Sequence, residues 1–105
     1  MEDHELFSGL IRLHILYHAS QGPIFGLWII RELERHGYRL SPGTLYPILH
    51  GMEKRGYLVS GTEEAGGRRR RVYRITEEGR RVLAAARMKV RELFGELFAE
   101  NPDGD

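Results

Sequence analysis

The chain of 105 residues contains no cysteine, a single tryptophan and no long apolar run. Without cysteine, the protein can form neither a disulfide, nor a thiol nucleophile, nor a cysteine-ligated zinc site. The sequence has no stretch of about 18 apolar residues and no basic start followed by an apolar segment, so it predicts neither a transmembrane helix nor a secretory signal. We therefore expect a cytoplasmic protein with no membrane partner.

The sequence also has almost no excess of charge of either sign, because the formal net charge is only +1. A hydrophobic content of 41% and a charged content of 30% are ordinary for one folded domain of this length. The charges are nevertheless segregated along the chain. Residues 68–74 hold five arginines and no acid: Arg68, Arg69, Arg70, Arg71 and Arg74. This segment is a candidate surface for a polyanion, although a basic run by itself more often forms a solvated loop.

The first half of the chain predicts three short helices. The first runs from about residue 5 to 20 and the second from about 24 to 36. Ser41 is the expected N-cap of the third helix, and Pro42 suits its first position, where a missing N–H costs nothing. An apolar stripe at helical spacing marks the first helix: Leu6, Leu10, Leu13 and Tyr17.

The third predicted helix has an unusual composition, since glycine and proline occupy its interior. Its core-facing stripe is Leu45, Ile48, Leu49 and Met52. The opposite face holds Gly43, Pro47, His50, Gly51 and Lys54. An interior proline costs about 3 kcal/mol and each glycine up to about 1 kcal/mol, so helix stability does not explain this face. A slim outer face suits a helix that lies in the DNA major groove, about 12 Å wide; the alternative is that Pro47 only kinks a surface helix.

Beyond residue 57 the sequence predicts a β-hairpin and then a long helix. The two arms are residues 57–62 and 71–76, and they enclose the segment 63–68, whose paired glycines permit the turn. Thr76 is the expected N-cap of the last helix, with Glu77 and Glu78 in its first turn. Helix, turn, recognition helix and basic hairpin in this order indicate a winged helix-turn-helix, an α+β fold that is mostly α.

The last helix carries an apolar seam that continues beyond what one short chain can cover. Its members recur at heptad spacing: Gly79, Leu83, Ala86, Val90, Leu93 and Leu97. We therefore expect a homodimer interface formed by Leu83, Ala86, Val90, Leu93 and Leu97. The predicted organisation is a DNA-binding domain in residues 1–75, a dimerisation helix in 76–100 and a flexible tail in 101–105.

Three motifs together resemble the PadR family of transcriptional regulators. They are the recognition helix "SPGTLYPILHGMEKRGYL", the wing "GGRRRRVYRIT" and the "EEG" that follows it. The segment "FGLWIIRELERHGY" is similar to the second helix of that family. The resemblance extends over about residues 10–98 and is closest to the small subgroup with one long C-terminal helix. It implies a homodimeric DNA-binding regulator, usually a repressor, whose operator is an inverted repeat in double-stranded DNA.

The resemblance also implies which residues meet DNA. From the helix they are Ser41, Thr44, Tyr46, Pro47 and His50, and from the wing Arg68, Arg69 and Arg70. Lys54 joins them because the helix offers few other side chains for reading bases. Gly51 departs from the family pattern, in which an arginine is common at this position.

Two features raise the question of an effector. His14 and His18 stand four residues apart, the spacing at which two imidazoles can share a divalent metal; a satisfied pair at an interface is the alternative. Trp28 points away from the apolar stripe of its helix. The resemblance implies small aromatic effectors near the dimer interface, so Trp28 either lines an effector pocket or packs under a terminal helix. No cofactor is required.

The sequence therefore favours a DNA-binding transcriptional regulator, expected to be a repressor that a small molecule or a metal releases. A metal-responsive regulator that uses His14 and His18, or a protein-interaction module without operator specificity, remain alternatives. An enzyme is disfavoured, because the histidines form no recognisable catalytic set with Ser8, Ser20 or Ser60.

Overall fold

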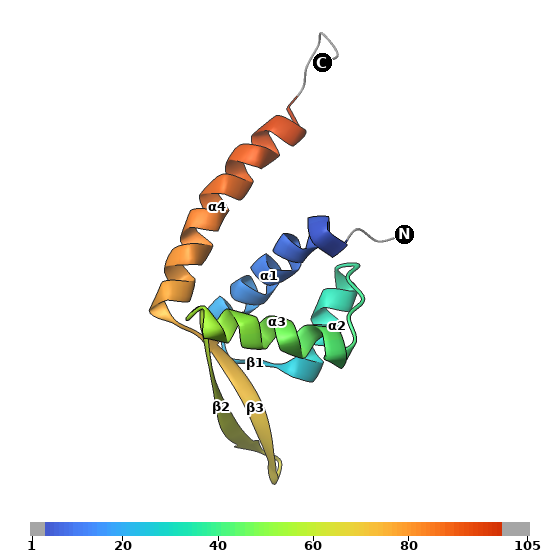
Figure 1. Ribbon diagram of the computed structural model, residues 1–105, viewed down its shortest axis with the longest axis vertical. Coiled ribbons are helices and arrows are strands. Elements are labelled where there is room, and N and C mark those ends of the chain that lie inside the picture. The colour runs from blue at the N-terminus through green and yellow to red at the C-terminus, as the bar shows by residue number, and fades with distance from the viewer. Residues whose placement is uncertain (1–3, 100–105) are drawn as a thin grey trace.

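The computed structural model describes residues 4–99 and is mostly helical, with one small sheet (Figure 1). The helices are α1 (His4–Gln21), α2 (Gly26–Arg35), α3 (Pro42–Lys54) and α4 (Glu77–Leu97). The strands are β1 (Ile24–Phe25), β2 (Leu58–Ala65) and β3 (Arg68–Ile75). This order confirms the predicted winged helix-turn-helix with an additional C-terminal helix. None of the helices in the described range is long and apolar enough to cross a membrane.

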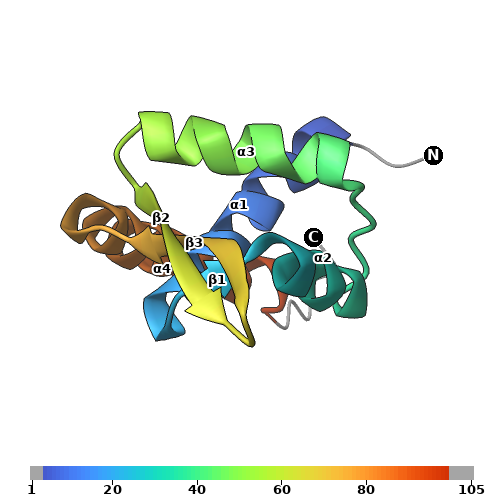
Figure 2. The same ribbon diagram turned by 90° about the horizontal axis from the view of Figure 1, so that it is seen from below.

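The sheet is antiparallel with strand order β1-β3-β2, and its long hairpin projects from the body as the wing (Figures 1 and 2). The turn lies at the predicted pair of glycines, and the strands are longer than the predicted arms. Both strands continue until only Gly66 and Gly67 connect them, with φ of +60° and +78°. A two-residue turn with two positive φ angles matches the right-handed twist of a hairpin, and glycine adopts those angles without strain.

The second predicted helix began too early. Ile24 and Phe25 form β1, opposite Tyr73 and Val72 of β3, and α2 starts only at Gly26. The β-branched and aromatic side chains at these two positions favour a strand, and β3 offers an edge for them to pair with. This short strand anchors the base of the wing to the helix-turn-helix.

The core lies where α1, α2 and α3 meet the sheet. Its fully buried members are Ile15, Ile24, Ile29, Leu33, Leu45, Leu49, Leu58 and Tyr73. The predicted inner stripe of α3 is confirmed, since Leu45, Leu49 and Met52 are buried and Ile48 is partly buried against the same cluster. The outer face of α3 therefore points away from the protein.

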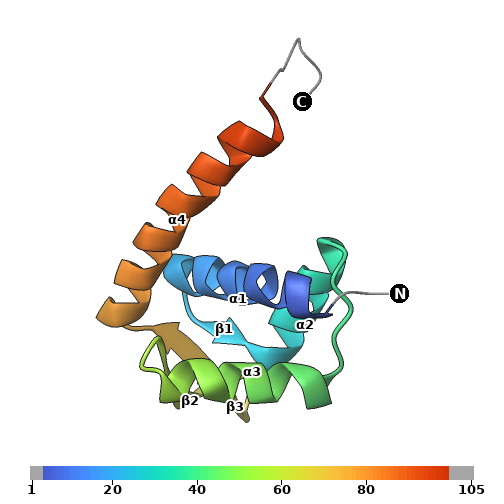
Figure 3. The ribbon, with the colours of Figure 1, turned by 45° about the horizontal axis from the view of Figure 1, so that its top comes forward.

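Helix α1 has two apolar faces, and the predicted stripe identified the outer one. Ile11 and Ile15 pack into the core, whereas Leu6, Leu10 and Tyr17 are exposed. A helix that is apolar on most of its surface cannot be oriented from hydrophobic periodicity alone. Its second face lies toward α4 (Figure 3).

Only the N-terminal part of α4 packs on the domain, and the rest extends away from it, at the opposite end from α3 and the wing (Figures 1 and 3). Thr76 caps the helix as predicted, because its hydroxyl accepts a hydrogen bond from Gly79 N–H at 2.9 Å. Gly79 and Leu83 are buried, but Leu93 is 49% and Leu97 is 66% exposed. The tail expected at 101–105 lies outside the described residues.

Candidate functional site

The N-terminus of α3 is organised by a serine cap. The Ser41 hydroxyl oxygen accepts a hydrogen bond from Thr44 N–H at 3.3 Å, and Pro42 follows the cap as predicted. The hydroxyls of Ser41 and Thr44 are also in contact at 3.3 Å. Both residues are exposed, so this end of the helix presents two hydroxyls and the N-terminal positive dipole to the outside.

The outer face of α3 is as bare as its sequence predicts. All five of its predicted members are exposed: Gly43, Pro47, His50, Gly51 and Lys54. An added Cβ at Gly51 would meet no heavy atom within 4 Å. No contact within the described part of the chain therefore requires a glycine at position 51. The small side chains on the outer face of α3 must be explained by a partner outside the protein.

Tyr46 differs from the other predicted contact residues, because it is partly buried against α2. A Cβ at Gly26 would overlap the ring and hydroxyl of Tyr46, so the absence of a side chain at Gly26 makes room for this tyrosine. The ring centroids of Tyr46 and His50 are 6.5 Å apart. Tyr46 thus fixes α3 against α2, the first helix of the helix-turn-helix. Its ring lies beside His50 on the outer face of α3.

The wing carries its arginines on β3, in two different environments. The Arg74 guanidinium pairs with Glu63 at 2.6 Å, Arg71 donates to the Ser60 hydroxyl at 3.2 Å, and Arg70 lies over the Phe25 ring at 5.2 Å. Across the described chain, no ion pair or side-chain hydrogen bond involves Arg68 or Arg69. These two exposed cations directly follow the glycine turn on β3 and remain available for an external anion.

A carboxylate connects α3 to the wing. Glu53, in the last turn of α3, accepts hydrogen bonds from the backbone N–H of Ser60 at 3.0 Å and from its hydroxyl at 2.8 Å. These bonds lower the pKa of Glu53 below its ordinary value. Helix and wing are therefore held in a fixed relation.

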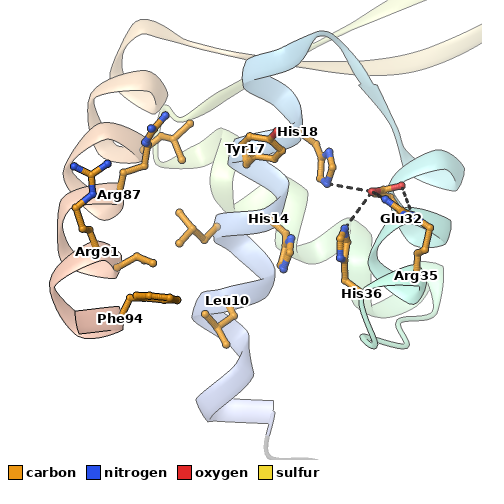
Figure 4. Close-up of a pocket in the computed structure, with 13 residues that line it drawn as sticks. Leu10, His14, Tyr17, His18, Glu32, Arg35, His36, Arg87, Arg91 and Phe94 are labelled. Atoms are coloured by element: carbon orange, nitrogen blue, oxygen red, sulfur yellow. Dashed lines mark hydrogen bonds and ion pairs between the residues drawn. The ribbon is translucent and has the colours of Figure 1, made fainter. Parts of the chain in front are cut away.

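On the other side of the protein, α1, α2 and α4 enclose an open groove of about 900 Å³ (Figure 4). The wall from α4 presents Arg87, Val90, Arg91 and Phe94, and α1 contributes Leu10 and Tyr17 to the floor. The far wall is polar and consists of histidines and an ion pair from α1 and α2.

Three histidines gather at this polar wall. His14, His18 and His36 each have one ring nitrogen that lies within 4.8 Å of the corresponding nitrogens of the other two. Glu32 faces them, with its Oε2 atom 3.2 Å from His36 Nε2 and 3.6 Å from His18 Nε2. Burial lowers the pKa of His14 and of His18, and for His14 the neighbouring His36 and His18 lower it further. The hydrogen bond from Arg35 lowers the pKa of Glu32 to about 2. The wall therefore combines a carboxylate with two imidazoles, those of His14 and His18, whose neutral form is favoured.

Comparisons with known proteins agree with this geometry. Residues 15–85 match the model of the "Transcriptional regulator PadR-like family". The chain is 52% identical over 94 residues to "Transcriptional regulator Rv3488" of Mycobacterium tuberculosis, and the match covers 90% of this chain and 88% of that protein. This chain belongs to the PadR-like family of transcriptional regulators.

Solved structures support the same assignment. A PadR family transcriptional regulator from Eggerthella lenta superimposes with a TM-score of 0.74 at 31% identity, covering 92% of this chain and 88% of the other. A PadR-like transcriptional regulator from Bacillus cereus gives a TM-score of 0.80 at 25% identity, covering 92% and 99%. PadR-like proteins are regulators of transcription and not enzymes, so the chemistry to explain is binding.

In this PadR-like chain, the sequence located the two histidines of α1 but not their partners. Glu32 was missed, and His36 was a further candidate without clear geometry, because it follows the end of α2 and gives no helical pattern with His14 or His18. The only available signal was the i, i+4 spacing of Glu32 and His36, which repeats that of the α1 pair. Trp28 is 47% exposed and meets the edge of the His18 ring at 5.4 Å. It packs beside the polar wall and is not among the residues that line the groove.

Proposed function

We propose that this regulator binds double-stranded DNA with α3 in the major groove and the wing on the adjacent backbone. The observation that carries the proposal is the bare outer face of α3, beside a wing whose tip arginines have no partner in the described chain. A slim helix allows close approach to the floor of the groove, and exposed arginines neutralise phosphate charge. The Glu53 bridge keeps the two elements in register.

The proposed contacts divide into two classes. Ser41, Arg68, Arg69 and Arg70 would bind phosphate and fix the position of the protein. Thr44, Tyr46, Pro47, His50 and Lys54 would face the bases and the sugar edges. Because none of these five is arginine, asparagine or glutamine, bidentate base contacts are scarce. DNA shape and backbone contacts then supply much of the selectivity, with a specific to non-specific ratio of about 10³ to 10⁴.

We further propose a homodimer that forms through α4 and the outer face of α1. The support is the row of apolar side chains on the free part of α4, where Val90, Leu93 and Leu97 are exposed among the described residues. Leu83 and Ala86 continue the seam toward the domain. Two-fold symmetry would present two α3 helices to an inverted repeat, with half-sites about 10 bp or a multiple apart.

We place the effector site, through which the protein would be released from DNA, in the groove between α1, α2 and α4, beside the proposed dimer interface. The protein would act as a repressor, and an effector in this groove would change how α4 lies on α1. Its apolar floor and the two arginines of α4 suit a small aromatic molecule, with Trp28 close to the polar wall. DNA release by such a molecule is part of the proposal.

The salt dependence of DNA binding tests the central proposal. We expect Arg68→Ala and Arg69→Ala each to weaken binding to operator and random duplexes to a similar extent. Each lost phosphate contact makes the plot of log K against log salt concentration shallower, by about 0.9 in slope. Arg12→Ala is the matched control, because Arg12 is an exposed arginine that bonds only to Ser8 in its own helix among described residues.

Two results would count against DNA binding through the wing. The first is a chain that binds no duplex even at low salt, which would leave the protein-interaction module as the better reading. The second is an equal loss for the Arg12 variant, which would show that the effect reflects total charge and not the wing.

A further inference from the structure

The polar wall of the groove has the composition of a metal site. Three imidazoles, those of His14 and His18 from α1 and of His36 directly after α2, each offer one ligand atom here, and the Glu32 carboxylate of α2 lies beside His18 and His36 (Figure 4). Imidazole nitrogen and carboxylate oxygen are the ligands with which proteins bind zinc and related divalent transition metals, whereas magnesium and calcium prefer oxygen alone.

The distances from Glu32 to two of the histidines are close to those of a tetrahedral centre. Two ligand atoms bound to the same zinc ion stand about 3.3 Å apart, since Zn–N and Zn–O bonds are about 2.0–2.1 Å long. The Glu32 Oε2 atom already lies 3.2 Å from His36 Nε2 and 3.6 Å from His18 Nε2. One ligand nitrogen from each of the three imidazoles lies within 4.8 Å of the others, so the most distant nitrogens must move closer by up to about 1.5 Å. Rotation about the broad χ2 torsion of histidine provides such a movement without a backbone shift.

We propose that His14, His18, His36 and Glu32 bind one divalent transition-metal ion per chain, with zinc as the best-suited ion. The sequence pointed to the α1 pair alone, and two ligands make a weak site. The structure supplies a third imidazole and a carboxylate, which complete a four-ligand set without cysteine and without a second chain.

Arg35 opposes the metal in this arrangement. Its Nη2 atom donates to the same Glu32 Oε2 atom at 2.8 Å, and its side chain is 70% exposed. A bound dication repels the guanidinium and replaces it on the carboxylate, and the exposed side chain can swing into solvent. Arg35 therefore lowers metal affinity and acts as the counter-charge of Glu32 when no metal is bound.

Metal binding at this site would join α1 to the first helix of the DNA-binding motif. Two ligands belong to α1, which also carries part of the proposed dimer interface, and two belong to α2 and its C-cap, next to α3. The ion would thus fix the position of the helix-turn-helix on the dimerisation surface. The metal site stands on the geometry of the four ligands, and only its effect on DNA rests on the function proposed above.

The first experiment measures metal binding directly on the tag-free, EDTA-treated full chain. Zinc affinity is obtained by competition with a chromophoric chelator, and Co²⁺ is titrated as a spectroscopic probe. We expect one ion per chain and the intense visible absorption of tetrahedral Co²⁺. Co²⁺ should also quench the fluorescence of Trp28, the only tryptophan, because its ring lies 5.4 Å from that of His18.

Matched variants locate the ligands. We expect His14→Asn, His18→Asn and His36→Asn each to weaken zinc binding at least tenfold, and His50→Asn on α3 to leave it unchanged. Glu32→Gln should weaken binding, whereas Glu34→Gln, an exposed neighbour on α2, should not. Arg35→Gln should strengthen binding about threefold or more. Circular dichroism of each metal-free variant confirms that the fold is retained.

Zinc should also raise the melting temperature of the parent by several degrees and that of His36→Asn by much less. Zinc binding of parent strength in the His14 or His36 variants would overturn the proposal, as would an absence of saturable binding at 100-fold excess of zinc. A zinc site that has no effect on DNA affinity would leave the metal site intact and refute only its coupling to the recognition helix. Failure of the metal-free parent to bind DNA would instead contradict the proposed function.

Discussion

Gly51 offers a test in which stability and DNA binding change independently. It is exposed on α3, and an added Cβ would meet no heavy atom of the described residues within 4 Å. Replacing a helical glycine with arginine or glutamate raises helix propensity by up to about 1 kcal/mol. Because Gly51 lies near the C-terminus of α3, the helix dipole favours arginine further and opposes glutamate. Gly51→Arg should therefore stabilise the fold by about 0.5–1 kcal/mol, and Gly51→Glu by less.

The effect on DNA should be opposite for the two variants. With one new phosphate contact per subunit, Gly51→Arg should strengthen binding several-fold. It should also make the fall of log K with log salt concentration steeper, by about 0.9 in slope for each contact. Gly51→Glu places a negative charge against the phosphates and should weaken binding at least tenfold, although the protein is no less stable. Gly95 in α4 is the matched control, because it is also a helical glycine with nothing within 4 Å.

Fluorescence anisotropy with a labelled duplex and urea unfolding measure the two quantities on the same samples. If both Gly51 variants bind DNA like the parent, or if the corresponding Gly95 variants change DNA binding equally, then the outer face of α3 does not lie against DNA. In that case the slim helix would need another explanation, and Pro47 with its neighbouring glycines would only mark a surface helix.

Further predictions concern residues at contacts between secondary-structure elements and at the proposed dimer interface. Gly79→Ala should destabilise the protein by about 1–3 kcal/mol in urea unfolding, because its Cβ would overlap the Tyr57 carbonyl, whereas Gly95→Ala should be neutral or stabilising. Glu53→Gln should cost about 1–2 kcal/mol at neutral pH. Since the folded pKa of Glu53 is lowered, the stability it contributes is present above its ordinary pKa of 4.5 and disappears as the pH falls through the folded value, so parent and variant should converge in acid. Leu93→Asp should convert the dimer to a monomer in sedimentation at micromolar concentration, and a parent that is already monomeric there would refute the proposed interface.

The sequence was sufficient for those parts of the molecule in which one local rule dominates. Ser41 and Thr76 were identified as N-caps because their side chains suit that position, and both accept the expected hydrogen bond. The inner and outer faces of α3 also followed from its 3.6-residue period. These features depend on neighbours along the chain, which a sequence displays directly.

Features that depend on distant neighbours were predicted less well. β1 exists because Ile24 and Phe25 meet the edge of β3, almost fifty residues further along the chain. The inner face of α1 could not be chosen, since Ile11 and Leu10 are equally apolar and only the tertiary packing separates them. The histidine and glutamate cluster likewise depends on how α1 crosses the end of α2, which no periodicity encodes.

Site-directed cleavage of DNA tests the central proposal most directly. The chain has no cysteine, so Lys54→Cys places a single thiol in the last turn of α3, on the side proposed to face DNA, where an iron chelate can be attached. On saturated operator DNA we expect strong strand cleavage within each half-site, related by two-fold symmetry, and no cleavage from the same reagent on Gly95→Cys in α4. Uniform cleavage, or equal cleavage from both positions, would contradict the placement of α3 at the DNA.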